Sequence, residues 1–295
     1  MIRRALVVLG LAAVVGSSPR GAGAQAPAAP KPATGAPEAP RENRPQPSPE
    51  DVERAKAIQS FKESDRLPPE PQRMVEIANT HAYVSIPPDR KPPLPGIVLV
   101  HEWWGLNDHI KQFADKLARE GYAVIAVDLY GGKVATVAPI AMAYKNAVDE
   151  KRAMEILHAA FDFLASTNSI RATRRGCIGF CFGGGWSLQL ALAEPRMSAD
   201  VIYYGNLVTD PEKLKALRCP VLGVFGNRDE SIPPKLVDEF EAGLKAAGVP
   251  HEILRYDAVH AFANPSNPKY DAASADAAWV KVRAFLAANL KKPAK

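Results

Sequence analysis

A cysteine lies between closely spaced glycines at residues 179–183, which read Gly-Phe-Cys-Phe-Gly. This spacing is that of a nucleophile elbow, a sharp turn from a strand into a helix, with cysteine in the place where serine is usual. The side chain of Cys181 would be exposed at such a turn, and the start of the helix would favour its thiolate form. The pattern predicts a nucleophilic thiol, although a glycine-rich turn around an unreactive cysteine would have the same spacing.

An acid and a base of suitable types follow Cys181 in the sequence. Asp229 comes after the apolar run 221–225, and His260 comes after the run 253–256. A thiol becomes a strong nucleophile when an imidazole accepts its proton, and a carboxylate on the other ring nitrogen fixes the imidazole tautomer. The order nucleophile, acid, base is that of the α/β-hydrolase triad. We therefore expect Cys181, Asp229 and His260 to act as a catalytic triad.

Other residues compete for these two roles. Glu230 and Asp257 are alternative acids, but Asp257 is so close to His260 in the sequence that we expect it to shape the turn. His101 and His109 precede the nucleophile and are less favoured as the base. The remaining histidines are expected to be structural or exposed: His81, His158 and His251.

The loop after the apolar run 96–100 begins at residue 101 with His-Glu-Trp-Trp-Gly-Leu-Asn. An oxyanion hole at an elbow uses the N–H of the residue after the nucleophile and an N–H from this loop, which predicts the Phe182 and Trp103 amides. Glu102 is either a solvent-facing loop residue or a functional carboxylate. The aromatic residues near the predicted site indicate a pocket for an apolar or aromatic substrate: Trp103, Trp104, Tyr130 and Phe262.

The candidate catalytic residues can meet only in a fold that brings the ends of several strands together, and the hydrophobic pattern of the sequence predicts such a fold. Continuous apolar runs are typical of parallel strands that are buried on both faces. Helical segments alternate with most of them, which predicts an α/β fold, a mostly parallel doubly wound sheet with helices on both faces. Ligands bind beyond the carboxyl ends of such strands. The runs are 96–100, 123–127, 176–180, 201–204, 221–225 and 253–256, and the helices are 110–120, 148–165, 186–193, 235–246 and 272–290.

The N-terminal part of the chain has a different character. Residues 1–24 read as a signal peptide, with arginines at the start, a short apolar run and an Ala-Gly-Ala cleavage site. The apolar run is too short to span a membrane, so we expect no stable membrane insertion after its removal. Residues 25–49 form a Pro/Ala-rich spacer that cannot bury a core. Residues 50–295 form the predicted catalytic domain, with a short helix over 48–62 and a hairpin over 73–86 at its beginning.

The composition excludes several other classes of function. The net charge is +5, and three of the arginines lie within residues 1–24, so the sequence gives no basic stripe for nucleic acid. No cofactor motif and no metal-ligand spacing of Cys and His is present. Cys177 and Cys219 are expected to be buried free thiols near the starts of two core strands. The protein is expected in the periplasm or outside the cell, and its oligomeric state is not indicated.

Taken together, the motifs resemble those of the dienelactone hydrolase family (carboxymethylenebutenolidases) over about residues 75–290. They are His-Glu-x-x-Gly-Leu-Asn from residue 101, Asp-Leu-Tyr from 128, Gly-Phe-Cys-Phe-Gly-Gly from 179, Asp-x-x-Ile-Pro from 229 and His-x-Phe from 260. The resemblance implies the same triad. It also implies that Glu102 is the additional glutamate of the family, which hydrogen-bonds the resting thiol until the substrate displaces it.

The sequence departs from the family at two positions that concern the substrate. Members that act on dienelactone hold its carboxylate with two arginines, and the matching positions here are Gly132 and Asn264. Lys133 is the basic residue nearest to these positions in the sequence. We therefore expect an exported enzyme whose substrate is a small ester or lactone, which it cleaves through an acyl-Cys181 intermediate. The alternatives are a true dienelactone hydrolase and a hydrolase-fold binding protein with little turnover.

Overall fold

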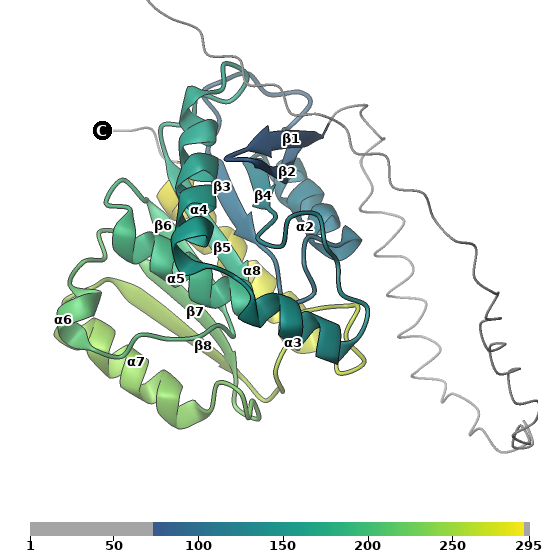
Figure 1. Cartoon of the computed structure of the whole chain (residues 1–295). Helices are drawn as coiled ribbons and strands as arrows, with labels where there is room; N and C mark the ends of the chain where they lie inside the picture. The colour runs from purple at the N-terminus through teal and green to yellow at the C-terminus, as the bar shows by residue number, and fades with distance from the viewer. Residues whose placement is uncertain (1–72, 292–295) are drawn as a thin grey trace, which may run out of the picture. The chain divides into compact units, whose positions relative to one another are not determined.

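The computed structural model describes residues 73–291, and these residues form a single eight-stranded sheet with helices on both faces (Figure 1). The strand order is β1-β2-β4-β3-β5-β6-β7-β8. From β4 to β8 all neighbours in the sheet are parallel, and β2 and β1 continue it in antiparallel pairing. The predicted α/β fold with a mostly parallel sheet is confirmed. The strands are β1 (Met74–Ile77), β2 (Thr80–Ser85), β3 (Gly96–Val100), β4 (Ala123–Val127), β5 (Arg175–Phe180), β6 (Ala199–Tyr203), β7 (Val221–Gly226) and β8 (His251–Tyr256).

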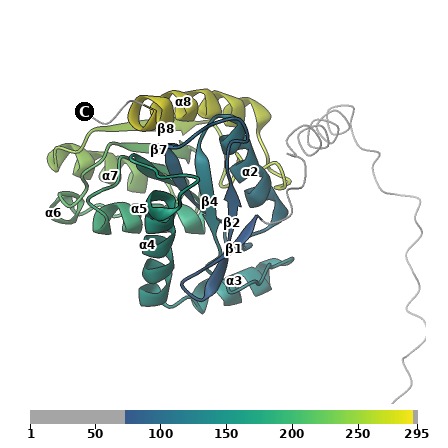
Figure 2. The same ribbon diagram turned by 90° about the horizontal axis from the view of Figure 1, so that it is seen from above.

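The helices divide into two layers, which Figure 2 shows on opposite sides of the sheet. One core cluster contains buried residues of α2 and α8, and the other contains buried residues of α4, α5, α6 and α7. Every residue of β3 to β7 is buried, which explains why these strands read as continuous apolar runs. The helices are α2 (Asp108–Arg119), α3 (Ala138–Asn146), α4 (Glu150–Ser166), α5 (Phe182–Ala193), α6 (Pro211–Leu214), α7 (Pro234–Ala246) and α8 (Ala272–Leu290).

The sheet reverses its direction of growth at β3, and this reversal determines where a ligand can bind. From β3 the chain passes through α2 to β4 on one side, and later through α3 and α4 to β5 on the other side. Diverging connections leave a crevice at the carboxyl ends of such strands. The loop that follows β3 and the turn that follows β5 therefore meet at this crevice.

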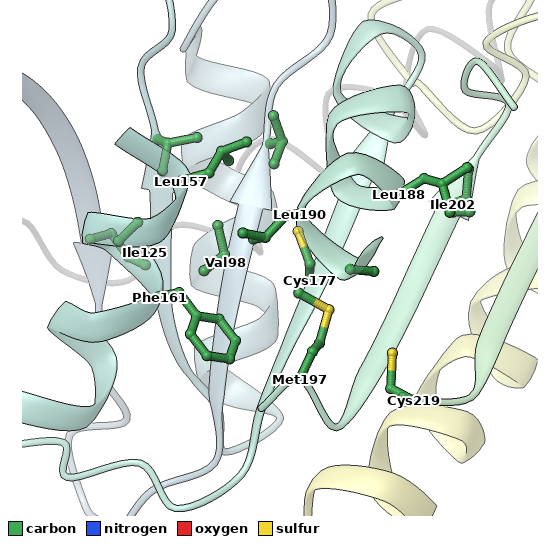
Figure 3. Close-up of a cluster of buried hydrophobic side chains, with 14 of the residues drawn as sticks. Val98, Ile125, Leu157, Phe161, Cys177, Leu188, Leu190, Met197, Ile202 and Cys219 are labelled. Carbon is green, nitrogen blue, oxygen red and sulfur yellow. The ribbon is translucent and has the colours of Figure 1, made fainter. Parts of the chain in front are cut away.

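The core between the sheet and α4 and α5 contains two of the three cysteines (Figure 3). Cys177 and Cys219 are both free and buried, as predicted. Burial raises the pKa of both thiols above the ordinary value, and the nearby Asp200 carboxylate raises it further. Because the thiolate is the reactive form, these two cysteines are chemically inert in the folded protein.

The local predictions are confirmed with shifts at the helix ends. The hairpin β1–β2 has positive φ at both turn residues, Ala78 and Asn79, as a two-residue hairpin turn requires. The helix α2 begins before the predicted residue because the Asn107 side chain accepts a hydrogen bond from the Ile110 N–H and caps it. Two helices were not predicted, α3 and α6; α3 buries only Ala141 and therefore has no apolar stripe.

The predictions for the N-terminal part of the chain lie outside the described residues. These are the signal peptide over 1–24, the spacer over 25–49 and the helix over 48–62. Within residues 73–291, no helix is both long and apolar enough to span a membrane.

Candidate active site

Cys181 lies at the sharp turn between β5 and α5, in the strained conformation that the elbow predicts. Its φ is 53° and its ψ is −115°, a combination that non-glycine residues rarely adopt. A Cβ atom at Gly179 would lie 1.9 Å from the Gly183 carbonyl oxygen, and a Cβ at Gly183 would lie 2.3 Å from the Val100 carbonyl oxygen. Glycine is therefore required at both positions because the strand, the helix and the neighbouring strand β3 approach too closely for a side chain.

His260 and Asp229 meet Cys181 in one hydrogen-bonded series. The Nε2 atom of His260 lies 3.1 Å from the Cys181 Sγ, and its Nδ1 atom lies 2.7 Å from the Asp229 Oδ2. The other carboxylate oxygen of Asp229 accepts hydrogen bonds from the Ser231 and Ile232 N–H groups, at 2.8 and 2.9 Å. The loop that follows β7 thus fixes the carboxylate, and the carboxylate fixes the imidazole.

The surroundings of His260 favour its protonated form. Burial lowers the pKa of the imidazole, but the hydrogen bonds to Asp229 and to Cys181, together with their negative charges, outweigh burial and raise the pKa to about 10. The side chain of Asp229 is fully buried, so its interaction with His260 is poorly screened by solvent. The hydrogen-bond partners of His260 therefore favour a protonated imidazole at this place in the site.

The competing acids and bases lie elsewhere. Asp257 is exposed and pairs with Arg228, with 2.9 Å between the Asp257 Oδ1 and the Arg228 Nε, and Glu230 is exposed. His109 is buried in α2 and lines a small hollow together with Phe113, Phe180 and Trp279. None of these side chains is hydrogen-bonded to Cys181 or His260 within the described residues.

Glu102 is buried rather than solvent-facing, and its partner is not the thiol. The Asn264 Nδ2 donates a hydrogen bond to the Glu102 Oε2, while the Asn264 Oδ1 accepts a hydrogen bond from the Ser266 N–H at 2.8 Å. Burial raises the pKa of Glu102 to about 7, although Asn264, His260 and Tyr204 each act to lower it. The structure thus differs from the resting contact that the family resemblance implies, because Asn264 holds the carboxylate.

The two amides predicted for the oxyanion hole are both available. The Phe182 N–H is in the first turn of α5, where helical amides have no acceptor within the helix. The Trp103 N–H makes no hydrogen bond to another described residue. Both residues line the cavity above Cys181. The geometry is therefore compatible with two N–H donors near the thiol.

His101 determines the direction of the Trp103 N–H, a role that sequence reasoning missed. Its Nε2 accepts a hydrogen bond from the Leu129 N–H at 3.2 Å, so the proton is on Nδ1, which lies 2.6 Å from the Glu102 carbonyl oxygen. The Gly105 N–H also donates to this oxygen, at 3.1 Å. Because the N–H and C=O of a trans peptide point in opposite directions, the Trp103 N–H points away from His101. Burial lowers the pKa of His101 and keeps the ring neutral.

A cavity of about 790 Å³ opens above Cys181. Trp103 and Trp104 line it, as predicted, and Met142 of α3 forms another part of its wall. The prediction that Tyr130 and Phe262 line the cavity is wrong. Both rings are buried beneath it: Tyr130 packs edge-on against His101, and Phe262 packs against Tyr204 and Tyr256.

The charges around the cavity also differ from the sequence interpretation. Gly132 and Lys133 do not line it, and the Lys133 Nζ lies over the Tyr144 ring, 5.5 Å from the centroid. Two lysines that the sequence did not single out are among the lining residues, Lys145 of α3 and Lys269. Within residues 73–291, no three His, Cys, Asp or Glu side chains are grouped as a metal site would require.

The dienelactone hydrolase family matches the chain over residues 80–290. A protein of Methylorubrum extorquens with the provisional name carboxymethylenebutenolidase is 32% identical over 217 residues, which cover 68% of this chain and 74% of the relative. A protein of Escherichia coli K12 with the same provisional name is 34% identical over 219 residues, which cover 69% of this chain and 80% of the relative.

Solved structures show the same relationship. A crystal structure from Klebsiella pneumoniae, provisionally assigned as a dienelactone hydrolase, matches with a TM-score of 0.65 and 30% identity over 70% of this chain and 92% of that chain. A dienelactone hydrolase-like promiscuous phosphotriesterase from metagenomic libraries matches with a TM-score of 0.65 and 26% identity over 74% of this chain and 97% of that chain. The chain belongs to the dienelactone hydrolase family and is an ester or lactone hydrolase with the α/β-hydrolase fold.

Proposed function

We propose that the protein is an exported hydrolase that cleaves a small ester or lactone through a Cys181-His260-Asp229 triad and an acyl-Cys181 intermediate. The observation that carries this proposal is the continuous series of hydrogen bonds from the thiol through the imidazole to the buried carboxylate. Thiol, imidazole and carboxylate in this order are the parts that nucleophilic acyl transfer needs.

The first half of the reaction forms the acyl-enzyme. The His260 Nε2 accepts the proton of the Cys181 thiol, and the Sγ attacks the carbonyl carbon of the substrate. The carbonyl oxygen becomes an oxyanion that the Trp103 and Phe182 N–H groups stabilise. The C–O bond then breaks, and the proton on the His260 Nε2 passes to the leaving oxygen. With a lactone, the leaving hydroxyl stays attached to the acyl group. Asp229 keeps the imidazolium oriented and stabilises its charge throughout.

The second half of the reaction releases the acid. His260, now neutral, takes a proton from a water molecule, and the hydroxyl attacks the thioester carbon. The same two N–H groups stabilise the second oxyanion. The C–S bond breaks, the Cys181 Sγ takes the proton from the His260 Nε2, and the carboxylic acid leaves. The thiol and the neutral imidazole are then in their starting state.

The lining of the cavity supports a neutral substrate. The Asn264 side chain is a neutral amide that already binds Glu102 and the Ser266 N–H, and Gly132 has no side chain, so neither supplies the positive charge of a carboxylate clamp. Two planar guanidinium groups bind a carboxylate bidentately, whereas a lysine at a cavity wall offers a single hydrated charge. Lys145 and Lys269 therefore replace this clamp poorly.

The decisive experiment combines a substrate panel with mass spectrometry. The purified protein is assayed with aryl acetates, enol lactones, dienelactone and, because of the phosphotriesterase among its structural neighbours, a phosphotriester. Intact mass is measured within one turnover. We expect turnover of neutral esters or lactones and a mass increase of one acyl group on Cys181, which is absent in Cys181→Ala. Ester turnover at full rate in Cys181→Ala would refute the mechanism.

Two other interpretations give different results in the same experiment. A true dienelactone hydrolase turns over the free dienelactone carboxylate with a higher kcat/KM than any neutral ester. A binding protein with little turnover forms the acyl adduct stoichiometrically and then releases it slowly. The export proposal rests on residues 1–24 and is tested separately, by fractionating cells that express the full chain and locating the protein without those residues in the exported fraction.

A further inference from the structure

A second hollow of about 720 Å³ adjoins the active-site cavity along α5. Its walls come from the end of α3, the segment between α3 and α4, the helices α4 and α5, and Asn206. The helices α4 and α5 lie on the same side of the sheet (Figure 1). Three residues line both spaces, namely Phe182, Lys145 and Asn206. Phe182 directly follows the nucleophile, so the hollow begins at the residue that borders Cys181.

The floor of the hollow is one face of α5. The residues of α5 that line it recur at helical spacing from Phe182 to Ala193, and Trp186 lies one turn after Phe182. The two rings are in edge contact, with 6.1 Å between their centroids. The lining is mixed in character. Five of its residues are large and apolar, namely Phe182, Trp186, Leu192, Val148 and Met154, and five are polar, namely Lys145, Asn146, Glu150, Gln189 and Asn206. The five apolar side chains, in a hollow that continues from the catalytic cavity, are suited to contact an apolar group of the substrate, and the polar residues leave room for its far end to meet solvent.

The position of His260 decides which arm of the ester the hollow would receive. His260, Ser231 and Ile232 line the catalytic cavity but not the hollow. Since His260 protonates the leaving oxygen in the proposed reaction, the alcohol arm lies on its side of the cavity. The acyl arm then extends from the thioester carbon past Phe182, toward Trp186.

We propose that this hollow is an acyl-chain subsite, and that the enzyme prefers neutral esters whose acyl group is an extended alkyl or aryl chain. The inference rests on the proposed function, because it needs the acyl group on Cys181. The face from Phe182 to Leu192 extends about 15 Å along the helix. Each methylene that becomes fully buried in the hollow is expected to raise kcat/KM up to about fourfold, from the transfer of its surface out of water.

The experiment compares two series of neutral esters on the whole protein. One series keeps the p-nitrophenyl leaving group and lengthens the acyl group from acetyl to decanoyl. The other series keeps the acetyl group and lengthens the alcohol. We expect kcat/KM to rise stepwise along the acyl series and to stay nearly constant along the alcohol series. A rise only along the alcohol series would overturn the assignment of the hollow to the acyl chain.

A variant that fills the hollow makes the assignment specific. Gln189 is exposed on the floor of the hollow, so Gln189→Trp adds a ring there without disturbing the core. Its ratio of decanoyl to acetyl kcat/KM should fall at least tenfold. Val280→Trp, at a residue that is 64% exposed in α8 on the opposite layer, adds the same ring elsewhere and should keep the ratio.

The outcomes separate this inference from the proposed function. If acetyl esters are hydrolysed but kcat/KM does not depend on acyl length, the subsite is refuted and the hydrolase remains. If the acyl dependence is present but Gln189→Trp leaves the ratio unchanged, the chain lies elsewhere, and the subsite is again refuted. If no ester in either series is hydrolysed but a lactone is, the subsite is refuted and the hydrolase remains; if no ester and no lactone is hydrolysed, both the function and the subsite are refuted.

Discussion

Replacing His101 by phenylalanine tests whether a buried ring that never touches the substrate controls catalysis. Phenylalanine keeps a flat ring between Tyr130 and Phe182, whose centroids lie 4.7 and 5.8 Å from the His101 centroid. It removes the hydrogen bond to the Glu102 carbonyl oxygen and the acceptor for the Leu129 N–H. The Glu102–Trp103 peptide is then held only by the Gly105 N–H.

The size of the effect follows from these contacts. Loss of one oxyanion donor costs about 10²–10³ in kcat. Because one of the two hydrogen bonds that orient the Trp103 N–H remains, we expect a smaller loss, about 10–100-fold in kcat, with little change in KM. The unpaired Leu129 N–H should also lower the free energy of unfolding by about 1–3 kcal/mol. His101→Gln, which keeps a donor and an acceptor, should recover part of both.

The assay pairs ester turnover with alkylation of the thiol. Iodoacetamide reacts with Cys181 by displacement at a saturated carbon and creates no oxyanion at a carbonyl group. Iodoacetamide should therefore alkylate Cys181 in the His101→Phe variant at nearly the same rate as in the unmodified protein, while the rate of ester hydrolysis falls. Equal losses in both reactions would mean that the variant disturbs the thiol and imidazole pair, and unchanged ester turnover would mean that His101 does not position the amide.

Substitutions at five other residues have defined outcomes. Cys181→Ala should abolish hydrolysis, and iodoacetamide should label Cys181 in preference to the two buried thiols; Cys181→Ser should keep a small activity. His260→Ala should lower kcat by several orders of magnitude, and the double variant with Cys181→Ala should have little less activity than Cys181→Ala alone. Asp229→Asn should also lower kcat strongly, because the amide favours the wrong tautomer of the imidazole. Glu102→Gln should flatten the dependence of stability on pH. The folded state favours the neutral form of Glu102, because burial raises its pKa from 4.5 to about 7. The stabilisation of the folded state by neutral Glu102 is therefore fully present below pH 4.5 and is lost as the pH rises through 7. Asn264→Arg should move the preference from a lactone methyl ester toward its free carboxylate, by about 1.5–3 kcal/mol per charged hydrogen bond.

Each of these expectations can fail in a way that identifies the error. Additive losses in the double variant would show that thiol and imidazole act in different steps. If the free energy of unfolding depends on pH in the same way for Glu102→Gln and the unmodified protein, another group is responsible for that dependence. The buried Asp200 is an example, because burial raises its pKa to about 7 as well. A preference of the unmodified protein for the free carboxylate would assign the clamp to another cation, with Lys145→Ala as the variant that identifies it.

The fold, and the meeting of the Cys181, His260 and Asp229 side chains, could be predicted because their signals are local. A glycine two residues before and two after Cys181 is required by backbone contacts at the turn, and Asp229 and His260 each follow an apolar run. The contact between Glu102 and Asn264 joins residues 162 apart, and no local pattern specifies such a pair. Tyr130 was misplaced for a similar reason, since proximity to strand ends does not determine which rings lie on the cavity surface and which lie beneath it.

The origin of the site residues has a consequence for the order of folding. The contact between Cys181 and His260 joins residues 79 apart, and His260 follows β8, the last strand added at the edge of the sheet. Until β8 has paired with β7, the thiol has no imidazole partner and reacts as an ordinary cysteine. Contacts between such distant segments form late because their loop-closure entropy is high. The reactivity of the Cys181 thiol, followed during refolding, should therefore report when β8 has joined the sheet, and this measurement needs no substrate.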